Sequence, residues 1–583
     1  MTAVRRLLKH EWTLACAGAL ALALLMTWLL PPFVMWIFSA GATRTGFANP
    51  LHTIVGDAGD PTGQAWLLAW TGHALLHDPS ALWNTNAFFP DHNGLAFNDT
   101  LLGYAPAGFV GSGFPAAVLR YNIVFVLAFA LAALGAYALA RQLGANRIGA
   151  AVAGAAFAYA PWRYGHDGHL NILSSGGMPL ALAMLARGHG WSLRHGYRPE
   201  KVRPGWAVAG WLVAAWQVTL GFGIGLPFVY VLAGASLVGA VMWLVTRRPP
   251  VPRRLVVADL ATGAVFAVVA VAMALPYWHV RAEQPETLRS LAYVGVFSPT
   301  PRSLVVAPSD SLIWGNWHAA ARSALEPAST EKVLLCGYVL YALAGCGLFL
   351  SAWGVRRRIL LFAGAVITTV LALGTNTPVF QLVYRYLPGF DGSRTPGRLI
   401  VWPTLVLALL AAGFVTEAAR LVRRATTADW SDGLTRDFRA VAVRVVTVPL
   451  LVAVLIEGLP NLNHVPLADP PAAMAIAPTP TLVLPTDDYV DLTVMLWSTA
   501  GYPEIANGAS SVVTPVRDKV RTVAQTFPSQ QSVAALRALG VRSVVVVRSR
   551  VPGTPYEGAL NAPVDGLGIS RTDVGPDVLF RLN

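Results

Sequence analysis

Charged residues are scarce in this sequence. Asp, Glu, Lys and Arg make up 13% of the 583 residues, whereas hydrophobic residues make up 55%. A soluble domain carries about 25% charged residues, because it needs them to cover its surface. The composition therefore excludes an ordinary soluble protein and predicts an α-helical polytopic membrane protein.

Cysteine is also rare. The three cysteines, Cys16, Cys336 and Cys346, all lie in apolar segments. The last two are ten residues apart on one predicted helix, which is too far for a disulfide bond. The sequence therefore argues against a disulfide framework and against a thiolate metal site.

Acidic residues are the rarer of the two charge signs, with 30 Asp and Glu against 43 Lys and Arg. The net charge of +13 could indicate nucleic-acid binding. However, the basic residues form short clusters between apolar runs, as they do in the cytoplasmic loops of membrane proteins. We therefore expect a lipid bilayer as the partner of this charge, and no nucleic acid.

Long apolar runs, by contrast, are abundant. Runs of about 17 to 25 apolar residues can cross a bilayer. We predict about eleven spans in a transmembrane domain of residues 1–459, at 12–38, 118–140, 148–161, 171–187, 205–220, 222–246, 255–277, 333–353, 359–374, 399–419 and 441–459. A cytoplasmic N-terminus places the main basic clusters inside, so we predict a multi-pass protein of the cell membrane with an uncleaved first span.

The texture changes after residue 460. We predict strands at 481–485 and 541–547 and helices at 489–499 and 533–539. With an odd number of spans, this part lies outside the cell. We therefore predict a small extracytoplasmic α/β domain at 460–583, which covers a membrane-embedded site, binds an acceptor, or only stabilises the protein.

Acidic residues gather in the first outward loop, residues 41–117. This loop has a single arginine, Arg44, and five aspartates, namely Asp57, Asp60, Asp78, Asp91 and Asp99. Other outward segments add Arg163, His166, Asp167 and His169, then Glu326 and Glu331, then Arg394 and Arg398. Acids, histidines and arginines are thus predicted on one membrane face, with the first loop as the best candidate for catalysis.

This pattern resembles the GT-C superfamily, the polytopic glycosyltransferases that use polyprenyl-phosphate-linked sugars, and more narrowly its large bacterial branch related to the YfhO family. The resemblance rests on five segments: Gly56-Asp57, the Phe-Phe-Pro to Asn-Asp stretch at 88–99, the glutamate-bearing entry to the eighth span, Pro-Gly-Phe to Arg-Thr-Pro-Gly-Arg at 388–398, and the valine-rich tail at 539–547. It implies that Asp57 is catalytic, that Asp60 is the next candidate, and that Asp167 assists. It also implies a polyprenyl-phosphate sugar donor and an envelope glycan, lipid or protein acceptor.

The chemistry of sugar transfer assigns roles to the other candidates. A carboxylate such as Asp57 takes the proton of the acceptor hydroxyl, and arginines bind the departing phosphate. We expect substrate binding from Arg163, His166, His169, Glu326, Arg394, Arg398, Trp66 and Asp99. No cofactor is certain, but a divalent ion such as Mg²⁺ or Mn²⁺ has candidate ligands in Asp57, His166 and Asp167.

Each candidate also has a plainer interpretation. Asp57 or Asp60 could cap a helix that starts at Pro61, and Asp99 could be a turn residue. The arginines could anchor lipid headgroups, and the histidines could simply be solvated. At the level of the whole chain, the alternatives are a flippase-like lipid or solute transporter and a non-catalytic scaffold for envelope assembly. A carrier usually has ionisable groups near the bilayer midplane, and these spans have almost none.

Overall fold

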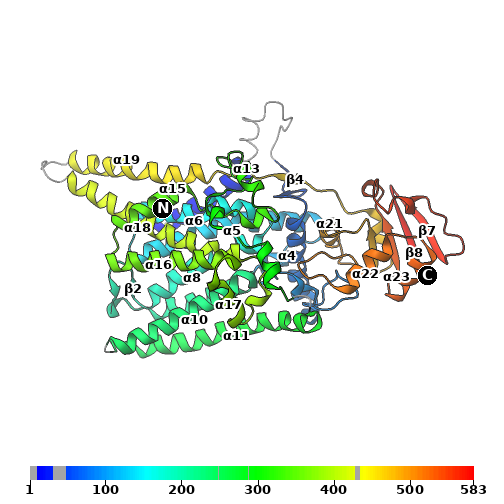
Figure 1. Cartoon of the computed structure of the whole chain (residues 1–583), viewed down its shortest axis with the longest axis horizontal. Coiled ribbons are helices and arrows are strands. Elements are labelled where there is room, and N and C mark those ends of the chain that lie inside the picture. Colours follow the sequence, from blue (N-terminus) through cyan, green and yellow to red (C-terminus); the bar gives the residue numbers. More distant parts are fainter. Residues whose placement is uncertain (1–9, 31–47, 247, 286–287, 427–433, 583) are drawn as a thin grey trace, which may run out of the picture. The chain divides into compact units, whose positions relative to one another are not determined.

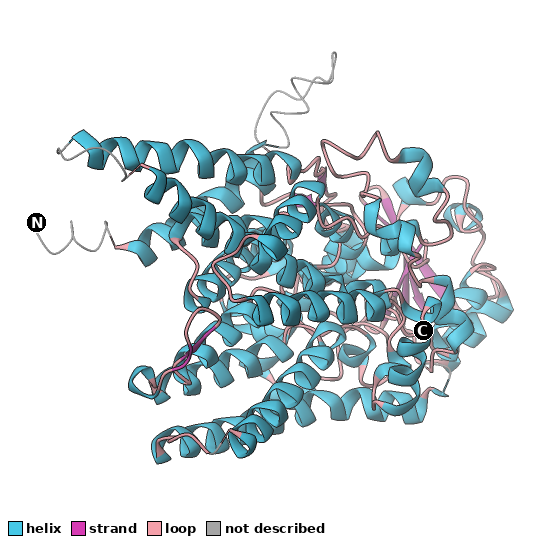
Figure 2. Ribbon diagram, turned by 60° about the vertical axis from the view of Figure 1, so that its left-hand side comes forward, coloured by secondary structure: helices cyan, strands magenta, loops and turns pink. Residues whose placement is uncertain are grey.

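Helices make up most of the computed structural model, which describes residues 10–30, 48–246, 248–285, 288–426 and 434–582 (Figure 2). Six helical segments among these residues are long and apolar enough to cross a membrane: α2 (Glu11–Leu24) with the π-helical turn η1 (Leu25–Leu29), α5 (Gly113–Leu143), α10 (Phe222–Val245), α11 (Arg253–Glu283), the 3₁₀ turn η11 (Pro396–Ile400) with α18 (Val401–Ala425), and the Arg439–Glu457 part of α19 (Leu434–Glu457). The predicted helical membrane protein is confirmed. The first residues of the predicted catalytic loop, 41–47, lie outside the described residues.

The remaining predicted spans contain shorter helices: α6 (Arg147–Ala158), α8 (Gly177–Gly188), α9 (Pro204–Val218), α15 (Tyr338–Phe349) and α16 (Val355–Ala372). Proline limits two of them. Helix α6 ends at Ala158, shortly before Pro161, and α9 begins with Pro204 in its first position, where proline needs no hydrogen bond. In these two segments the apolar run is therefore longer than the helix that it forms.

The contacts divide the chain into two compact units. The first comprises Met1–Thr45, Phe125–Ala272 and Leu288–Leu462, and the second comprises Gly46–Val124, Met273–Thr287 and Asn463–Asn583. The second unit thus joins the first outward loop to the tail of the chain.

Helix α18 forms the centre of the first unit and packs against α6, α15, α16 and α19. In its apolar stretch 83% of the residues are buried, against 11% in α10. Glycines permit the close approach: a β-carbon on Gly149 of α6 would lie 2.7 Å from the Ala412 carbonyl oxygen, and one on Gly347 of α15 would lie 2.3 Å from that of Leu410. Small residues have this role in many membrane helix pairs.

Short elements complete the first unit. They are η5 (Pro161–His166), α7 (Leu170–Leu173), β2 (Trp191–Ser192), β3 (Gly196–Tyr197), η6 (Pro199–Lys201), α12 (Leu291–Val296), η8 (Pro301–Val305), α13 (Ala319–Ser323), α14 (Ser329–Lys332), η9 (Gly374–Asn376), α17 (Pro378–Tyr386) and η10 (Phe390–Gly392). Strands β2 and β3 form a hairpin, and η5, α14 and η11 carry the polar residues discussed below.

A four-stranded sheet forms the C-terminal part of the second unit (Figure 1). Its strands are, in spatial order, β5 (Thr481–Leu484), β6 (Ser543–Val546), β8 (Asp577–Leu582) and β7 (Ile569–Val574). The pair β5–β6 is parallel and the other pairs are antiparallel. Apolar residues of α22 (Pro515–Ala524) and α23 (Gln530–Ala538) pack with the sheet in one core. The predicted small C-terminal sheet domain is therefore present.

The first outward loop belongs to the same unit. Strand β1 (Thr53–Val55) pairs antiparallel with β4 (His464–Pro466), and α4 (Asp60–His77) packs on α21 (Val490–Trp497). A β-carbon on Gly63 of α4 would lie 2.5 Å from Leu492 Cδ2, so glycine permits this packing. The smaller elements of the unit are η2 (Pro79–Ala81), η3 (Gly94–Phe97), η4 (Leu102–Phe109), α20 (Ala472–Ile476), η12 (Arg548–Arg550) and η13 (Glu557–Leu560).

Candidate functional site

The Asp57 side chain lies in the turn between β1 and α4. It is exposed, and its Oδ1 accepts a hydrogen bond from the Gly59 backbone N–H at 2.6 Å. No described residue donates a hydrogen bond to its Oδ2. The turn is itself fixed, because the Gly56 N–H donates to the Asn463 carbonyl at 3.0 Å. Asp57 therefore presents an accessible carboxylate in a defined position.

Asp60 has a different position, in the first turn of α4. Gly59 is the N-cap of this helix and Pro61 follows Asp60, so the negative charge lies at the positive end of the helix dipole. This favours the plainer interpretation for Asp60, in which it stabilises the helix start. Asp57 remains the better candidate for chemistry.

A buried polar cluster lies in the first unit and consists of His166, His169, Glu331 and Arg398. Arg398 holds Glu331 by two hydrogen bonds, from Nη2 to Oε1 at 2.5 Å and from Nε to Oε2 at 3.2 Å. His166 Nδ1 and His169 Nε2 each lie 3.9 Å from a Glu331 oxygen. The side chains of His166 and Glu331 are 1% and 7% exposed. We call these four residues the His–Glu–Arg cluster.

Backbone contacts bring the cluster together from three distant segments. The Trp162 N–H donates to the Leu335 carbonyl at 3.0 Å, which joins η5 to the segment after α14. A β-carbon on Gly397 would lie 2.7 Å from the Glu331 carbonyl oxygen, so this glycine lets η11 approach α14. The Glu331 carboxylate thereby meets the imidazoles of η5 and α7's N-cap on one side and Arg398 on the other.

Burial and charge set the protonation of the cluster. Burial by itself would raise the pKa of Glu331, but the charge of Arg398 and its hydrogen bonds to the carboxylate hold that pKa well below its usual value. Burial lowers the pKa of His166 to about 4 and that of His169 to about 3. At neutral pH the cluster therefore contains a carboxylate, a guanidinium and two neutral imidazoles.

This donor set fits a divalent cation. One ligand atom from each of His166, His169 and Glu331 lies within 4.8 Å of the others. His166 Nε2 is buried and has no hydrogen-bond partner among the described residues. Two neutral imidazoles with one carboxylate suit Mn²⁺ better than Mg²⁺, which prefers oxygen ligands. Asp167, predicted as a ligand, lies between the two histidines in the sequence and is half-buried. It is not part of this three-residue group.

Arg163 and Trp66, two predicted substrate contacts, are completely buried. The Arg163 guanidinium donates to the Leu173 carbonyl at 2.6 Å and to Ser175 Oγ at 3.0 Å. The Trp66 indole N–H donates to Asn86 Oδ1 at 3.0 Å. Both side chains are therefore used inside the protein, which argues against direct contact with a substrate.

The other predicted substrate contacts lie at the edges. Glu326 is exposed and accepts a hydrogen bond from Ser329 Oγ, five residues before the carboxylate that joins the cluster, Glu331. Arg394 precedes η11 and lies over the Phe297 ring, yet its charge acts on His169. Asp99 is half-buried near Tyr277 in the second unit. Glu326 therefore stays a predicted substrate contact outside the cluster, whereas Glu331, which was not among the predicted site residues, belongs to the cluster.

Several solved structures are similar to this chain at low sequence identity. No protein-family model and no curated protein matches the chain. ArnT from Cupriavidus metallidurans bound to undecaprenyl phosphate is 14% identical, over 98% of this chain and 98% of that chain, with a TM-score of 0.42. The archaeal oligosaccharyltransferase AglB from Archaeoglobus fulgidus is 14% identical, over 93% of this chain and 70% of that chain, with a TM-score of 0.42. The mycobacterial arabinofuranosyltransferase AftD is 18% identical, over 98% of this chain and 41% of that chain, with a TM-score of 0.48. At these identities and TM-scores, the similarities assign no role to an individual residue.

Proposed function

We propose that this chain is a membrane glycosyltransferase of the GT-C type, in the branch related to the YfhO family. It transfers a hexose or pentose from a polyprenyl-phosphate carrier to a hydroxyl of an envelope polymer, glycolipid or protein. The reaction takes place outside the cytoplasmic membrane, with the N-terminus inside and the C-terminal domain outside. The sequence resemblance and the distribution of basic clusters support this assignment and orientation.

Asp57 carries the proposal. In the proposed reaction its carboxylate takes the proton of the acceptor hydroxyl while the hydroxyl oxygen bonds to the anomeric carbon. The bond from that carbon to the phosphate oxygen breaks, and the lipid phosphate leaves with the electron pair. An exposed carboxylate held by one backbone N–H, with an oxygen left for the acceptor, is suited to this proton transfer.

The His–Glu–Arg cluster, taken within the first unit alone, has the groups that bind a phosphate. Its neutral imidazoles and Glu331 would hold a divalent cation, which would supply positive charge to phosphate oxygens. Arg398 keeps Glu331 ionised, and Arg394 adds a second guanidinium near His169. Arginine matches phosphate geometry with its planar fork of N–H groups, which supports a role in donor binding.

The test measures sugar transfer by the full-length protein in liposomes. Donors are undecaprenyl-phosphate-linked hexoses and pentoses, and acceptors are an envelope fraction. Asp57→Asn is expected to lower the transfer rate by about a hundredfold or more, because general-base catalysis is worth that much. The matched control is Asp78→Asn, since Asp78 is also exposed in this loop and also accepts a backbone N–H two residues on, from Ser80.

The control is expected to transfer sugar at a rate within about twofold of the wild type, as surface substitutions generally do little. Transfer by Asp57→Asn at the wild-type rate would overturn the assignment of the base and would favour the carrier or scaffold interpretation. A rate lost in both variants would show that the loop, and not the Asp57 carboxylate, is required.

A further inference from the structure

Tyr489 lies directly beside the turn that carries Asp57. A β-carbon built on Gly59 would lie 2.8 Å from Tyr489 Cε2 and 3.0 Å from Asp57 Oδ1, so the ring edge and the carboxylate flank the same glycine. The Asp57 charge also acts on the phenol: burial raises the pKa of Tyr489, and Asp57 raises it further. The first residues of α21 and the turn after β1 thus form one local surface.

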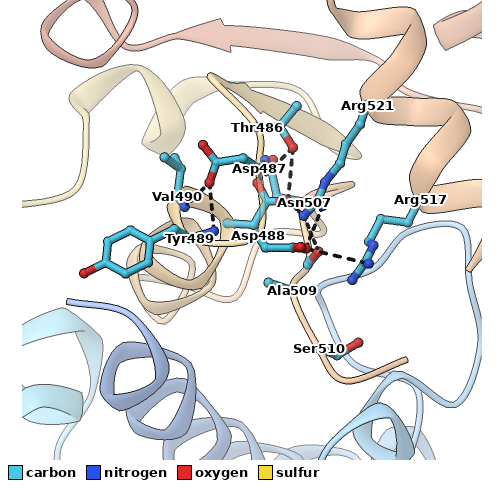
Figure 3. A network of polar contacts seen from close by, with 12 residues as sticks. Thr486, Asp487, Asp488, Tyr489, Val490, Asn507, Ala509, Ser510, Arg517 and Arg521 are labelled. Carbon is cyan, nitrogen blue, oxygen red and sulfur yellow. Dashed lines mark hydrogen bonds and ion pairs between the residues drawn. The ribbon is translucent and has the colours of Figure 1, made fainter. Parts of the chain in front are cut away.

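The ring is open to solvent although its backbone is fixed. Tyr489 is 54% exposed. Asp487 Oδ1 accepts hydrogen bonds from the N–H groups of Tyr489 and Val490, both at 2.7 Å, which fixes the start of α21. Figure 3 shows the ring directed away from Arg517 and Arg521, whose contacts with acids lie on the other side. An exposed aromatic ring on a fixed backbone binds ligands at a low cost in conformational entropy.

Arg550 adds a hydrogen-bond donor to this surface. Its guanidinium lies over the Trp497 ring, 4.8 Å from the centroid, and it is half-buried. Asp487 and Tyr489 act electrostatically on this guanidinium. Among the described residues no acceptor forms a hydrogen bond with its side chain. Stacking on Trp497 therefore holds a guanidinium whose N–H groups are left for a ligand.

We propose that Tyr489, Arg550 and Asp57 form the acceptor subsite, and that the acceptor is a neutral saccharide. We call these three residues the Tyr489 platform. This inference rests on the proposed function, because a ligand next to the base that removes a hydroxyl proton is the acceptor. A pyranose or furanose stacks its C–H face on the phenol ring, and its hydroxyls bind the carboxylate and the guanidinium.

Charge decides between the chemical classes of acceptor. Asp57, Asp60 and Arg550 all act electrostatically on Tyr489, and Asp487 accepts a hydrogen bond from the Tyr489 backbone N–H. Among these described groups carboxylates outnumber guanidinium groups, which disfavours a phosphate-rich or otherwise anionic acceptor. A neutral glycan satisfies both kinds of group through its hydroxyls. The negative charge of this surface is also compatible with a basic peptide, which the test therefore includes.

The test measures binding to the full-length protein in nanodiscs by saturation-transfer NMR, with no donor present. The probes are the neutral disaccharides maltose, cellobiose and α-1,6-mannobiose, and pentalysine as the basic peptide. At least one disaccharide is expected to bind the wild type. Tyr489→Ala is expected to weaken that binding by about tenfold, and Tyr489→Phe, which keeps the ring, to change it by less than about twofold.

Two controls separate this inference from the proposed function. Tyr386→Ala removes another exposed tyrosine, at the end of α17, and is expected to leave saccharide binding unchanged. Asp57→Asn is expected to lower transfer by about a hundredfold or more but to keep stacking on Tyr489, so that saccharide binding falls by less than about threefold. Loss of binding in Tyr489→Ala with full transfer in Asp57→Asn would support the platform and overturn the base.

Three results would overturn the platform. They are a wild type that binds none of the disaccharides, saccharide binding that Tyr489→Ala leaves unchanged, and binding of pentalysine in place of the sugars that depends on Tyr489. Gly59→Ala gives an independent check, because its added β-carbon would displace the ring edge without removing the ring. It is expected to weaken saccharide binding in the same direction as Tyr489→Ala.

Discussion

Asp57 and Glu331 are two carboxylates with opposite surroundings. Asp57 is exposed and accepts one backbone hydrogen bond, whereas the Glu331 side chain is 7% exposed and accepts hydrogen bonds from Nε and Nη2 of Arg398. Glu331 stays charged because the neighbouring Arg398 offsets its burial. An acid that exchanges protons with a substrate needs the first environment. An acid that organises a fixed cluster needs the second.

The support of the two acids also differs in kind. Glu331 depends on partners from η5 and η11 that touch its own side chain or backbone. Asp57 depends on the packing of its loop, which pairs β1 with β4 and inserts Asn86 into the tail: Asn86 Nδ2 donates to Ser498 Oγ and to the Pro503 carbonyl, both at 2.9 Å. We therefore expect substitution of Asp57 to affect function, and substitution of Glu331 to lower the stability of the protein.

The largest expected effect on stability comes from Glu331→Gln. The change leaves the Arg398 guanidinium without its carboxylate in a buried position, which costs about 3 kcal/mol. We expect the free energy of unfolding in mild detergent to fall by that amount. Asp57→Asn is expected to change it by less than about 0.5 kcal/mol, because Asp57 is exposed and its amide still accepts the Gly59 bond.

The matched control for this prediction is Glu326→Gln, an exposed glutamate on the same segment. It is expected to behave like Asp57→Asn. If Glu331→Gln were as stable as the wild type, the ion pair between Glu331 and Arg398 would not contribute to the free energy of unfolding. The contrast between the buried Glu331 and the exposed Asp57 would then fail.

The next largest effect is expected from Asn86→Ala. Asn86 is 7% exposed, and its amide accepts from Trp66 and donates to two groups of the tail, so its loss leaves several buried polar groups unpaired. We expect a loss of about 2 kcal/mol in the free energy of unfolding. Transfer is expected to fall as well, because the loop of Asp57 loses a contact with the tail.

Asn84→Ala is the control, since Asn84 is an exposed asparagine of the same loop that accepts one hydrogen bond, from the Asn93 N–H. Limited proteolysis between residues 78 and 100 reports the packing of the loop directly. Equal resistance of Asn86→Ala and the wild type would mean that the loop is held without the tail.

Much of the architecture could be predicted from the sequence. Apolar runs predict membrane helices because the bilayer demands internally satisfied backbone groups, and β-branched runs predicted β5 and β6. Two antiparallel strands at the end of the chain, β7 and β8, were missed. In β7, four consecutive polar residues, Ser570 to Asp573, hide the alternation that marks a strand. Asp57 was chosen through the resemblance to the GT-C superfamily, whose catalytic acid lies in the first outward loop, and it does lie exposed in a fixed turn.

Contacts between distant segments could not be predicted. Glu331 joins His166 and Arg398 only because the backbones of η5, α14 and η11 approach each other, and nothing near Glu331 in the sequence distinguishes it from Glu326. The same holds for Tyr489, which meets Gly59 across more than four hundred residues. Trp66 and Arg163 had the right chemistry for a site, but packing buried them. Residue type indicates chemistry, whereas only the fold decides exposure.

The smallest expected effect sharpens the comparison from the side of the buried acid. If the His–Glu–Arg cluster holds a cation, His169→Gln should weaken the binding of Mn²⁺ to the purified protein by about tenfold, as measured by electron paramagnetic resonance. His92 is an exposed histidine of the first loop, and His92→Gln should leave the affinity unchanged.

The pH dependence of Mn²⁺ binding follows from the buried histidines. Because burial lowers the pKa of His166 to about 4 and that of His169 to about 3, protons compete for these nitrogens only in acid. The affinity should therefore stay level from about pH 8 down to about pH 6 and fall below about pH 5, whereas an imidazole with the ordinary pKa near 6.5 would lose Mn²⁺ earlier. Equal affinities in both variants would mean that Glu331 pairs with Arg398 and holds no cation. Glu331 would then be a structural acid, in contrast to Asp57, the proposed base.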